Sequence, residues 1–180
     1  MVYQEKSVKV KDQLEIKLRS SKAKDAKAML HLLEETASET PFTGRNPGEM
    51  KMTVEEEEHF LEAMDQSPHM LLLIAECDEK IIATSHLRFF TAEKTSHRAQ
   101  VALAVSQVYW SLGIGTLLME ELLTLAKDRG TKLVELEYID GNERARNLYD
   151  KLGFIEVGRK PKAFKMEEDF FDEVLMVKEL

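Results

Sequence analysis

Two glycines, Gly113 and Gly115, follow an apolar run and stand at the start of an amphipathic segment. A helix begins with unpaired backbone N–H groups, and its macrodipole places about half a positive charge at that end. Glycine lets an anion approach this backbone closely because it has no Cβ. The turn can therefore hold a pyrophosphate, although two glycines can equally make a tight turn from a strand into a helix.

Two nucleotide-binding patterns match this turn poorly. A dinucleotide site needs the spacing G-x-G-x-x-G, and Leu118 stands where the third glycine is required. A phosphate-binding loop needs G-x-x-x-x-G-K followed by Ser or Thr, and the chain contains no such run. The spacing of the glycines alone thus leaves the nature of the anion open.

Three polar residues downstream of the turn could take part in acid–base chemistry. Asn142 suits the N-cap of a helix, and Tyr149 lies about two turns further along the same side. Glu137 lies between Leu136 and Tyr138 in an apolar strand, where burial would raise the carboxyl pKa toward that of a base near neutral pH. The residues alone are equally compatible with a helix cap, a packed aromatic ring and a solvated carboxylate.

The hydrophobic periodicity predicts the elements that position these residues. Strands are expected over residues 14–19, 70–76, 81–90, 101–105, 133–139, 154–157 and 174–177, and helices over 23–37, from 53 onward, over 112–129 and over 142–152. In the second helix Glu56 completes a capping box, and Phe60, Leu61 and Met64 are expected on one packed face.

The unit of strand, helix and strand from Val101 to Ile139 requires a crossover connection. We therefore expect one parallel pair inside an otherwise mostly antiparallel sheet, in a mixed α/β fold. Residues 101–105 are apolar on both faces, which favours a central strand covered on both sides.

Composition limits the classes of function. The 180 residues are 43% hydrophobic and 32% charged, as is typical of one soluble globular domain. A net charge of -8 argues against nucleic-acid binding, because phosphate neutralisation needs a cationic surface. The single cysteine, Cys77, excludes a disulfide framework within the chain and a multi-cysteine zinc site, and no metal is expected. No signal-peptide core or membrane span is evident, so a cytoplasmic protein is expected.

The run VALAVSQVYWSLGIGTLLMEELLTLAKDRG, followed by LVELEYIDGNERARNLYDKLGF, resembles the GCN5-related N-acetyltransferase (GNAT) superfamily. The resemblance covers about residues 99–158 and implies helices on both faces of a central sheet, with the parallel pair at the cofactor site. It also implies one domain over residues 1–180, with an acceptor-side half (1–98), acetyl-CoA-binding motifs (99–158) and C-terminal strands (159–180).

The resemblance also implies roles for particular residues. The glycine turn would hold the pyrophosphate of acetyl-CoA, with Trp110 in place of the usual Arg or Gln, and the preceding strand would pair with the pantetheine arm. Asn142 would contact the cofactor, Tyr149 would protonate the leaving thiolate, and Glu137 would accept the proton of the amine. The implied cofactor-binding residues are Leu103, Ala104, Val105, Trp110, Ser111, Leu112, Gly113, Ile114, Gly115, Thr116, Asn142 and Tyr149.

The substrate implied by the resemblance is a primary amine, on a small molecule or on a peptide or protein. Phe42 and Arg45, in the loop between the first two helices, are the candidate acceptor contacts. The resemblance leaves room for a homodimer, because strands near the C-terminus commonly pair across dimers in this superfamily. Two alternatives stay open: a non-catalytic acyl-CoA-binding or sensing domain on the same fold, and a nucleotide-binding module.

Overall fold

The computed structural model describes residues 1–180, which form one eight-stranded sheet in the order β1-β2-β3-β4-β5-β6-β8-β7. All neighbouring strands are antiparallel except β5 and β6, which confirms the expected mixed sheet with one parallel pair. The strands are β1 (Lys6–Lys9), β2 (Glu15–Ser20), β3 (Met70–Cys77), β4 (Lys80–Phe89), β5 (Arg98–Val105), β6 (Leu133–Ile139), β7 (Ile155–Met166) and β8 (Asp169–Glu179). The helices are α1 (Ala26–Glu39), α2 (Val54–Gln66), α3 (Ile114–Asp128) and α4 (Glu143–Lys151).

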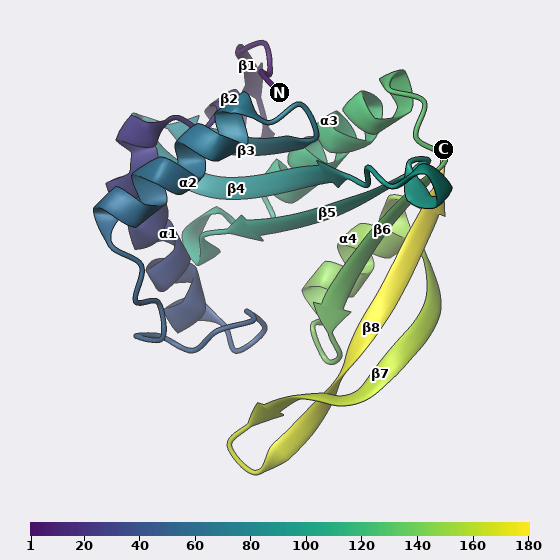
Figure 1. Cartoon of the computed structure of the whole chain (residues 1–180). Coiled ribbons are helices and arrows are strands. Elements are labelled where there is room, and N and C mark those ends of the chain that lie inside the picture. Colours follow the sequence, from purple (N-terminus) through teal and green to yellow (C-terminus); the bar gives the residue numbers. More distant parts are fainter.

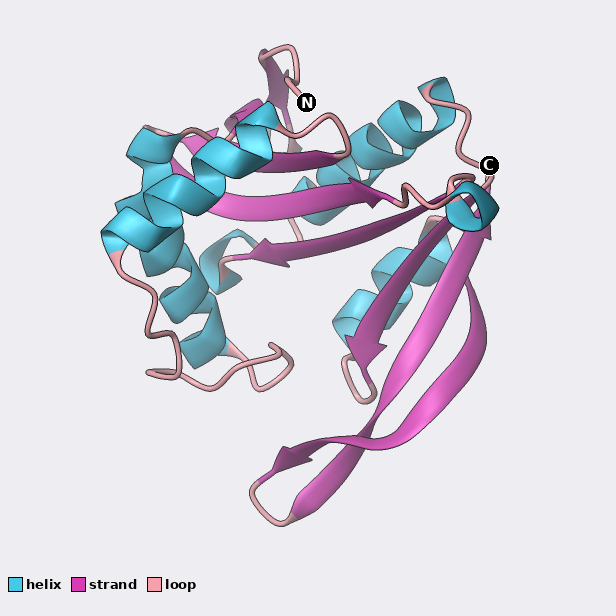
Figure 2. Cartoon of the chain, viewed as in Figure 1, coloured by secondary structure: helices cyan, strands magenta, loops and turns pink.

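Helices cover both faces of the sheet (Figure 2). Alternate residues of β3 point to opposite sides, so Leu72 and Ile74 pack under α1 and α2, while Leu71 and Leu73 join the larger core on the other side. That larger core contains the buried stripe of α3 and Tyr149 of α4. The β-strands therefore form a partition between two separate apolar layers.

The start of α2 is fixed by the capping box that the sequence predicts. The Glu56 N–H donates to Thr53 Oγ1 at 3.1 Å, and the Thr53 N–H donates to Glu56 Oε2 at 2.8 Å. The expectation that Phe60 packs with Leu61 and Met64 is wrong, because its side chain is 44% exposed. The buried stripe of α2 is centred on Glu57, Leu61 and Met64, which leaves Phe60 at its margin.

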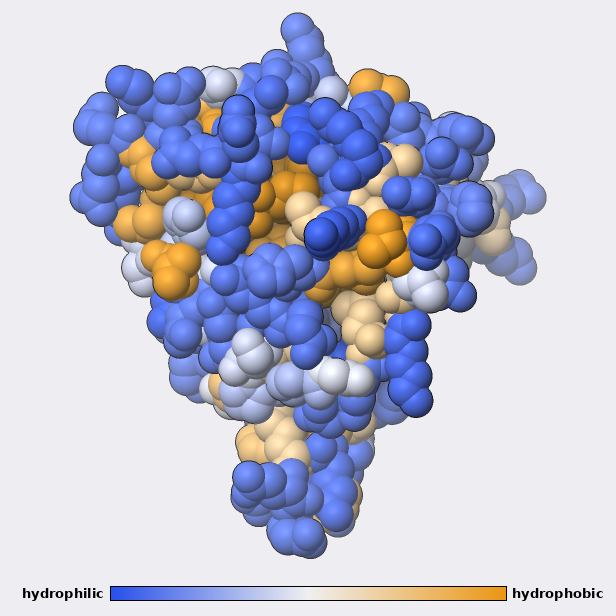
Figure 3. Space-filling view, turned by 90° about the vertical axis from the view of Figure 1, so that its left-hand side faces the viewer, coloured by the Kyte–Doolittle hydropathy of each residue, from blue (hydrophilic) through white to orange (hydrophobic).

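The surface over α1 and α2 carries mixed hydropathy. Figure 3 shows hydrophobic residues gathered in the upper part of this face, while the hairpin that projects below it is mostly hydrophilic. The exposed apolar residues around α2 are Met52, Val54 and Phe60.

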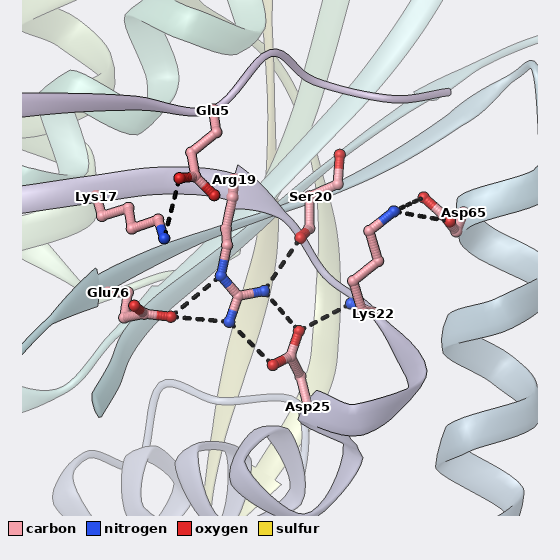
Figure 4. Close-up of polar contacts among 8 residues, drawn as sticks. All are labelled: Glu5, Lys17, Arg19, Ser20, Lys22, Asp25, Asp65 and Glu76. Atoms are coloured by element: carbon pink, nitrogen blue, oxygen red, sulfur yellow. Dashed lines mark hydrogen bonds and ion pairs between the residues drawn. The ribbon is translucent and has the colours of Figure 1, made fainter. Parts of the chain in front are cut away.

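A network centred on Arg19 ties the beginning of α1 to the sheet (Figure 4). The guanidinium of Arg19, in β2, donates to Asp25 Oδ2 at 2.6 Å and to Glu76 Oε2, in β3, at 2.8 Å. The backbone N–H of Lys22 donates to Asp25 at 2.8 Å. Burial alone would raise the pKa of Asp25, but the hydrogen bonds from Arg19 and Lys22 lower it overall.

Three strands differ from the sequence-based expectation. β1 was not expected, and β7 and β8 extend well beyond residues 154–157 and 174–177. Residues 159–165 and 168–173 are rich in charged residues and largely exposed, so they lack the alternating apolar pattern that reveals a half-buried strand. In the structure, backbone pairing from Ile155–Val177 to Met166–Asp169 carries this hairpin beyond the body of the sheet (Figure 1).

Candidate functional site

The sheet opens between β5 and β6. These strands pair only at Arg98–Leu133, Ala99–Val134 and Gln100–Glu135, whereas β4 stays paired with β5 as far as Val105. Figure 1 shows the two strands diverging beyond that point. The side chains of residues 102–105 are half-buried, so the expectation of a strand covered on both sides is wrong for this part of β5. The divergence leaves one edge of β5 without a neighbouring strand.

The hydrogen bonds at the two ends of β5 show which backbone groups face the opening. The Ser106 N–H donates to the Ile82 carbonyl at 3.0 Å, and the Arg98 carbonyl accepts from the Phe90 N–H at 3.2 Å, so both residues point toward the β4 side. Backbone polar groups alternate along a strand, and the β4–β5 register has no shift between these ends. Ala104 therefore bonds toward β4, and the odd-numbered residues point toward the opening.

Leu103 and Val105 consequently present their backbone to the space between β5 and β6. The Val105 carbonyl accepts a hydrogen bond from the indole N–H of Trp110 at 2.7 Å. The N–H and C=O of Leu103 and the N–H of Val105 can then serve a ligand that lies along this edge as an extra strand would.

The glycine turn lies directly after this edge. Gly113 is the N-cap of α3 with a φ of 91°, and no side chain caps the helix. The first hydrogen bond of the helix runs from the Leu117 N–H to the Gly113 carbonyl, at 2.9 Å. The N–H groups of residues 114–116 are thus available for an anion.

Gly115 lets α3 approach its neighbours closely. A Cβ at this position would lie 3.2 Å from Leu148 Cδ2 of α4 and 3.4 Å from Leu103 Cδ1 of β5. The glycine therefore keeps the anion-binding helix end against both the β5 edge and α4.

Tyr149 and Glu137 lie on opposite faces of the sheet. The ring centroids of Tyr138 and Tyr149 are 5.9 Å apart, and those of Tyr149 and Phe154 are 6.0 Å apart, so Tyr138 points toward α4. Because side chains alternate along β6, Glu137 points to the other face. Burial, with a smaller contribution from Tyr138, raises the pKa of Tyr149 to about 12, which keeps its hydroxyl protonated at neutral pH.

Glu137 is exposed on the face opposite α4. Partial removal of its carboxylate from water and the nearby carboxylates of Glu173 and Glu135 raise its pKa, while Lys160 and Arg88 act in the opposite direction. A carboxylate with a raised pKa is a stronger proton acceptor.

A short row of side chains crosses the strands beside Glu137. Arg88 Nη2 donates to Gln100 Oε1 at 2.6 Å, and Gln100 Nε2 lies 3.5 Å from Glu137 Oε2. His86 lies two residues before Arg88 and so on the same face of β4. Burial and then Arg88 lower the pKa of His86, which keeps the imidazole neutral near pH 7. Sequence analysis did not group Gln100 and His86 with the site, because the β4–β5 register that aligns them is a long-range property.

Asn142 caps α4 as the sequence predicts. Its Oδ1 accepts a hydrogen bond from the Ala145 N–H at 3.1 Å, which holds the side chain at the turn between β6 and α4.

The two candidate acceptor contacts separate in the structure. A Cβ on Gly141 would lie 3.4 Å from Phe42 and 3.9 Å from Phe171, so both rings lie against the β6–α4 turn. Arg45 instead contacts Met50 Sδ at 3.1 Å and lies near Glu57 of α2. The structure brings Phe42 to the opening and directs Arg45 away from it.

Two further observations concern metals and membranes. No group of three or more His, Cys, Asp or Glu side chains is arranged to hold a metal ion. None of the helices combines the length and the hydropathy that a membrane crossing would need.

The fold and the arrangement of these residues are those of a known protein family. The model of the acetyltransferase (GNAT) family matches residues 27–154, and the chain belongs to this family. Its fold is the GNAT fold, with the single parallel pair β5–β6 at the opening of the sheet.

Solved structures agree with the assignment. An acetyltransferase of the GNAT family from Streptococcus pneumoniae is 28% identical, with a TM-score of 0.85 over 92% of this chain and 99% of that one. The ribosomal-protein-alanine N-acetyltransferase of Brucella melitensis shares the fold at 22% identity, with a TM-score of 0.78 over 91% and 99%. The yncA protein of Salmonella typhimurium, solved with its cofactor acetyl-CoA, does so at 14% identity, with a TM-score of 0.77 over 91% and 93%.

Proposed function

We propose that the chain is an N-acetyltransferase that moves the acetyl group of acetyl-CoA to a primary amine by direct attack in a ternary complex. The observation that carries this proposal is the opening between β5 and β6, which has the phenol of Tyr149 on one face and the carboxylate of Glu137 on the other. A site with a proton donor and a proton acceptor on either side of a passage suits an amine that enters from one face while a thiol leaves on the other.

The residues at the opening fit the coenzyme. The N–H groups of residues 114–116 would hold its diphosphate, and the backbone of Leu103 and Val105 would pair with the amides of its pantetheine arm. Asn142 would contact that arm from the β6–α4 turn. When bound, the coenzyme supplies an acetyl thioester. The acetyl-CoA found with the Salmonella relative, which shares this fold, supports the assignment.

The side chains then provide the acid–base chemistry. An alkylamine has a pKa near 10 and must lose a proton before it can attack, and Glu137, directly or through a water, accepts that proton. The N–H of Leu103 or Val105 stabilises the negative charge that develops on the carbonyl oxygen. Tyr149 donates its proton to the departing thiolate, and the second proton that the attacking nitrogen loses restores the phenol. The raised pKa of Tyr149, about 12, keeps the phenol protonated until the thiolate forms beside it.

The acceptor enters from the face that carries Glu137. We place Phe42 and Phe171 at its entrance, because both rings pack against the β6–α4 turn beside the opening. The acceptor is an amine of a small molecule or of a peptide or protein, and the Brucella relative is named for acetylation of a protein alanine.

The test is release of free thiol from acetyl-CoA in the presence of polyamines, aminoglycosides, amino acids and N-terminal peptides. We expect at least one class to be acetylated, and Tyr149→Phe to lower kcat by about 10²-fold or more, the usual contribution of one acid–base group. Binding of coenzyme A without turnover of any amine would replace the proposal with a non-catalytic acyl-CoA-binding domain.

A further inference from the structure

Two cations lie at the glycine turn without a carboxylate partner among their contacts. The guanidinium of Arg144, in the first turn of α4, lies 4.3 Å from the centre of the Trp110 ring and donates to Ser111 Oγ at 3.1 Å. Lys11, from the turn between β1 and β2, donates to the Ser111 carbonyl at 3.0 Å. Arg146, on the same helix as Arg144, instead pairs with Asp150 at 3.7 Å.

The elements that bring these cations together are far apart in the chain. Lys11 comes from the N-terminal hairpin and Arg144 from α4, and both meet at Ser111, two residues before the N-cap of α3. The backbone N–H of Lys11 also donates to the Leu112 carbonyl at 3.4 Å. Cationic side chains that face backbone oxygens and a hydroxyl keep their full charge for an anion at the adjacent N–H groups.

Trp110 fixes the position of Arg144. The indole N–H is bonded to the Val105 carbonyl, so the ring cannot rotate without breaking that bond, and the guanidinium stacks on its face. Stacking orients an arginine without neutralising it, and its free N–H groups remain available for bidentate binding of phosphate. The aromatic residue at position 110 thus carries no charge itself but holds a charge from another helix over the turn.

We propose that Arg144 and Lys11, which meet at Ser111, form a clamp for the diphosphate of coenzyme A, with Trp110 as the positioning residue for Arg144. This inference rests on the proposed cofactor site. The clamp supplies side-chain charge at Ser111, beside the turn, whereas the N–H groups of residues 114–116 supply the backbone contacts.

The test measures binding of coenzyme A by isothermal titration calorimetry, which needs no turnover. We expect Arg144→Gln and Lys11→Gln each to raise Kd by about tenfold, the lower end for a hydrogen bond to a charged group, because both sites are exposed to solvent. The matched control Arg146→Gln, at an exposed position two residues from Arg144, should leave Kd unchanged. The loss should shrink at high salt, where the charge of the wild-type clamp is screened.

Pantetheine separates charge recognition from a structural role, because it lacks every phosphate. Wild type and Arg144→Gln should bind it equally well. If Arg144→Gln loses equal affinity for pantetheine and for coenzyme A, Arg144 only shapes the site. If Arg144→Gln binds coenzyme A with a Kd within twofold of wild type, Arg144 is not part of the clamp. If wild type binds coenzyme A but acetylates no amine, the proposed reaction is wrong. The clamp is then still tested by the Kd values of the variants for coenzyme A. If wild type does not bind coenzyme A, both proposals fall.

Discussion

Replacing Gly113 with alanine tests whether the left-handed N-cap of α3 is required at the proposed phosphate site. Gly113 has a φ of 91°, and a Cβ built on it meets no atom within 4 Å. The substitution therefore adds backbone strain without a collision. Gly115 offers the opposite case, because it lies within α3 without a positive φ while its Cβ would lie 3.2 Å from Leu148.

The expected magnitudes follow from this contrast. A residue with a Cβ in the left-handed region costs about 1–2 kcal/mol. For a chain of this size, that corresponds to a Tm lower by about 2–8 °C. At Gly115 the gain in helix propensity, up to about 1 kcal/mol, offsets the crowding against Leu148, so Gly115→Ala should shift Tm less than Gly113→Ala.

Thermal unfolding and calorimetric binding of coenzyme A, measured on both variants, provide the assay. Relief of strain at Gly113 rotates the peptide planes on either side, so Gly113→Ala should also bind coenzyme A more weakly. A Gly113→Ala protein that melts within 1 °C of wild type and binds coenzyme A equally well would refute the reasoning. If Gly115→Ala lowers Tm more than Gly113→Ala does, crowding against Leu148 would outweigh backbone strain, which contradicts the expected order.

Three further predictions concern charge. Glu173→Gln removes a carboxylate that raises the pKa of Glu137, so the acid limb of the plot of kcat/KM against pH should move to lower pH. An acid limb at the same pH as in wild type would exclude Glu137 as the base. Glu137→Gln should lower kcat by about 10²-fold or more. It should also raise Tm at neutral pH, because a group whose pKa is raised on folding loses its stabilising contribution as pH rises through that pKa; a lower Tm would contradict the raised pKa of Glu137. Asp25→Asn should lower the urea-derived free energy of unfolding by about 2 kcal/mol, because it removes one of the two carboxylates that pair with Arg19 and leaves Glu76 as the other. The gap should close as pH falls through the lowered pKa of Asp25; a pH-independent gap would indicate lost packing instead.

The sequence predicted the elements that carry the cofactor motifs well. The bounds of β6 and the capping of α4 by Asn142 agree with the pattern, because both depend on local periodicity and local hydrogen bonds. The parallel pair followed from the length of the crossover connection alone.

The features that the sequence did not predict depend on contacts between distant parts of the chain. The opening of β5 away from β6 is not visible in the apolar run of residues 101–105, which suits a covered strand equally well. Lys11 contacts Ser111, which is 100 residues away in the sequence, and Phe42 and Phe171 both lie beside Gly141 of the β6–α4 turn. Arg144 belongs to the run that resembles the GNAT superfamily, but its contact with Trp110 depends on the packing of α4 beside the glycine turn. Such pairings are set by tertiary structure and leave no local periodicity.

The most direct test is a crystal structure of the protein with coenzyme A. The diphosphate oxygens should lie within hydrogen-bond distance of the N–H groups of residues 114–116, with the pantetheine arm along Leu103 and Val105 and its thiol between Tyr149 and Glu137. Coenzyme A bound elsewhere, or a strand edge at β5 that the ligand does not touch, would contradict the account.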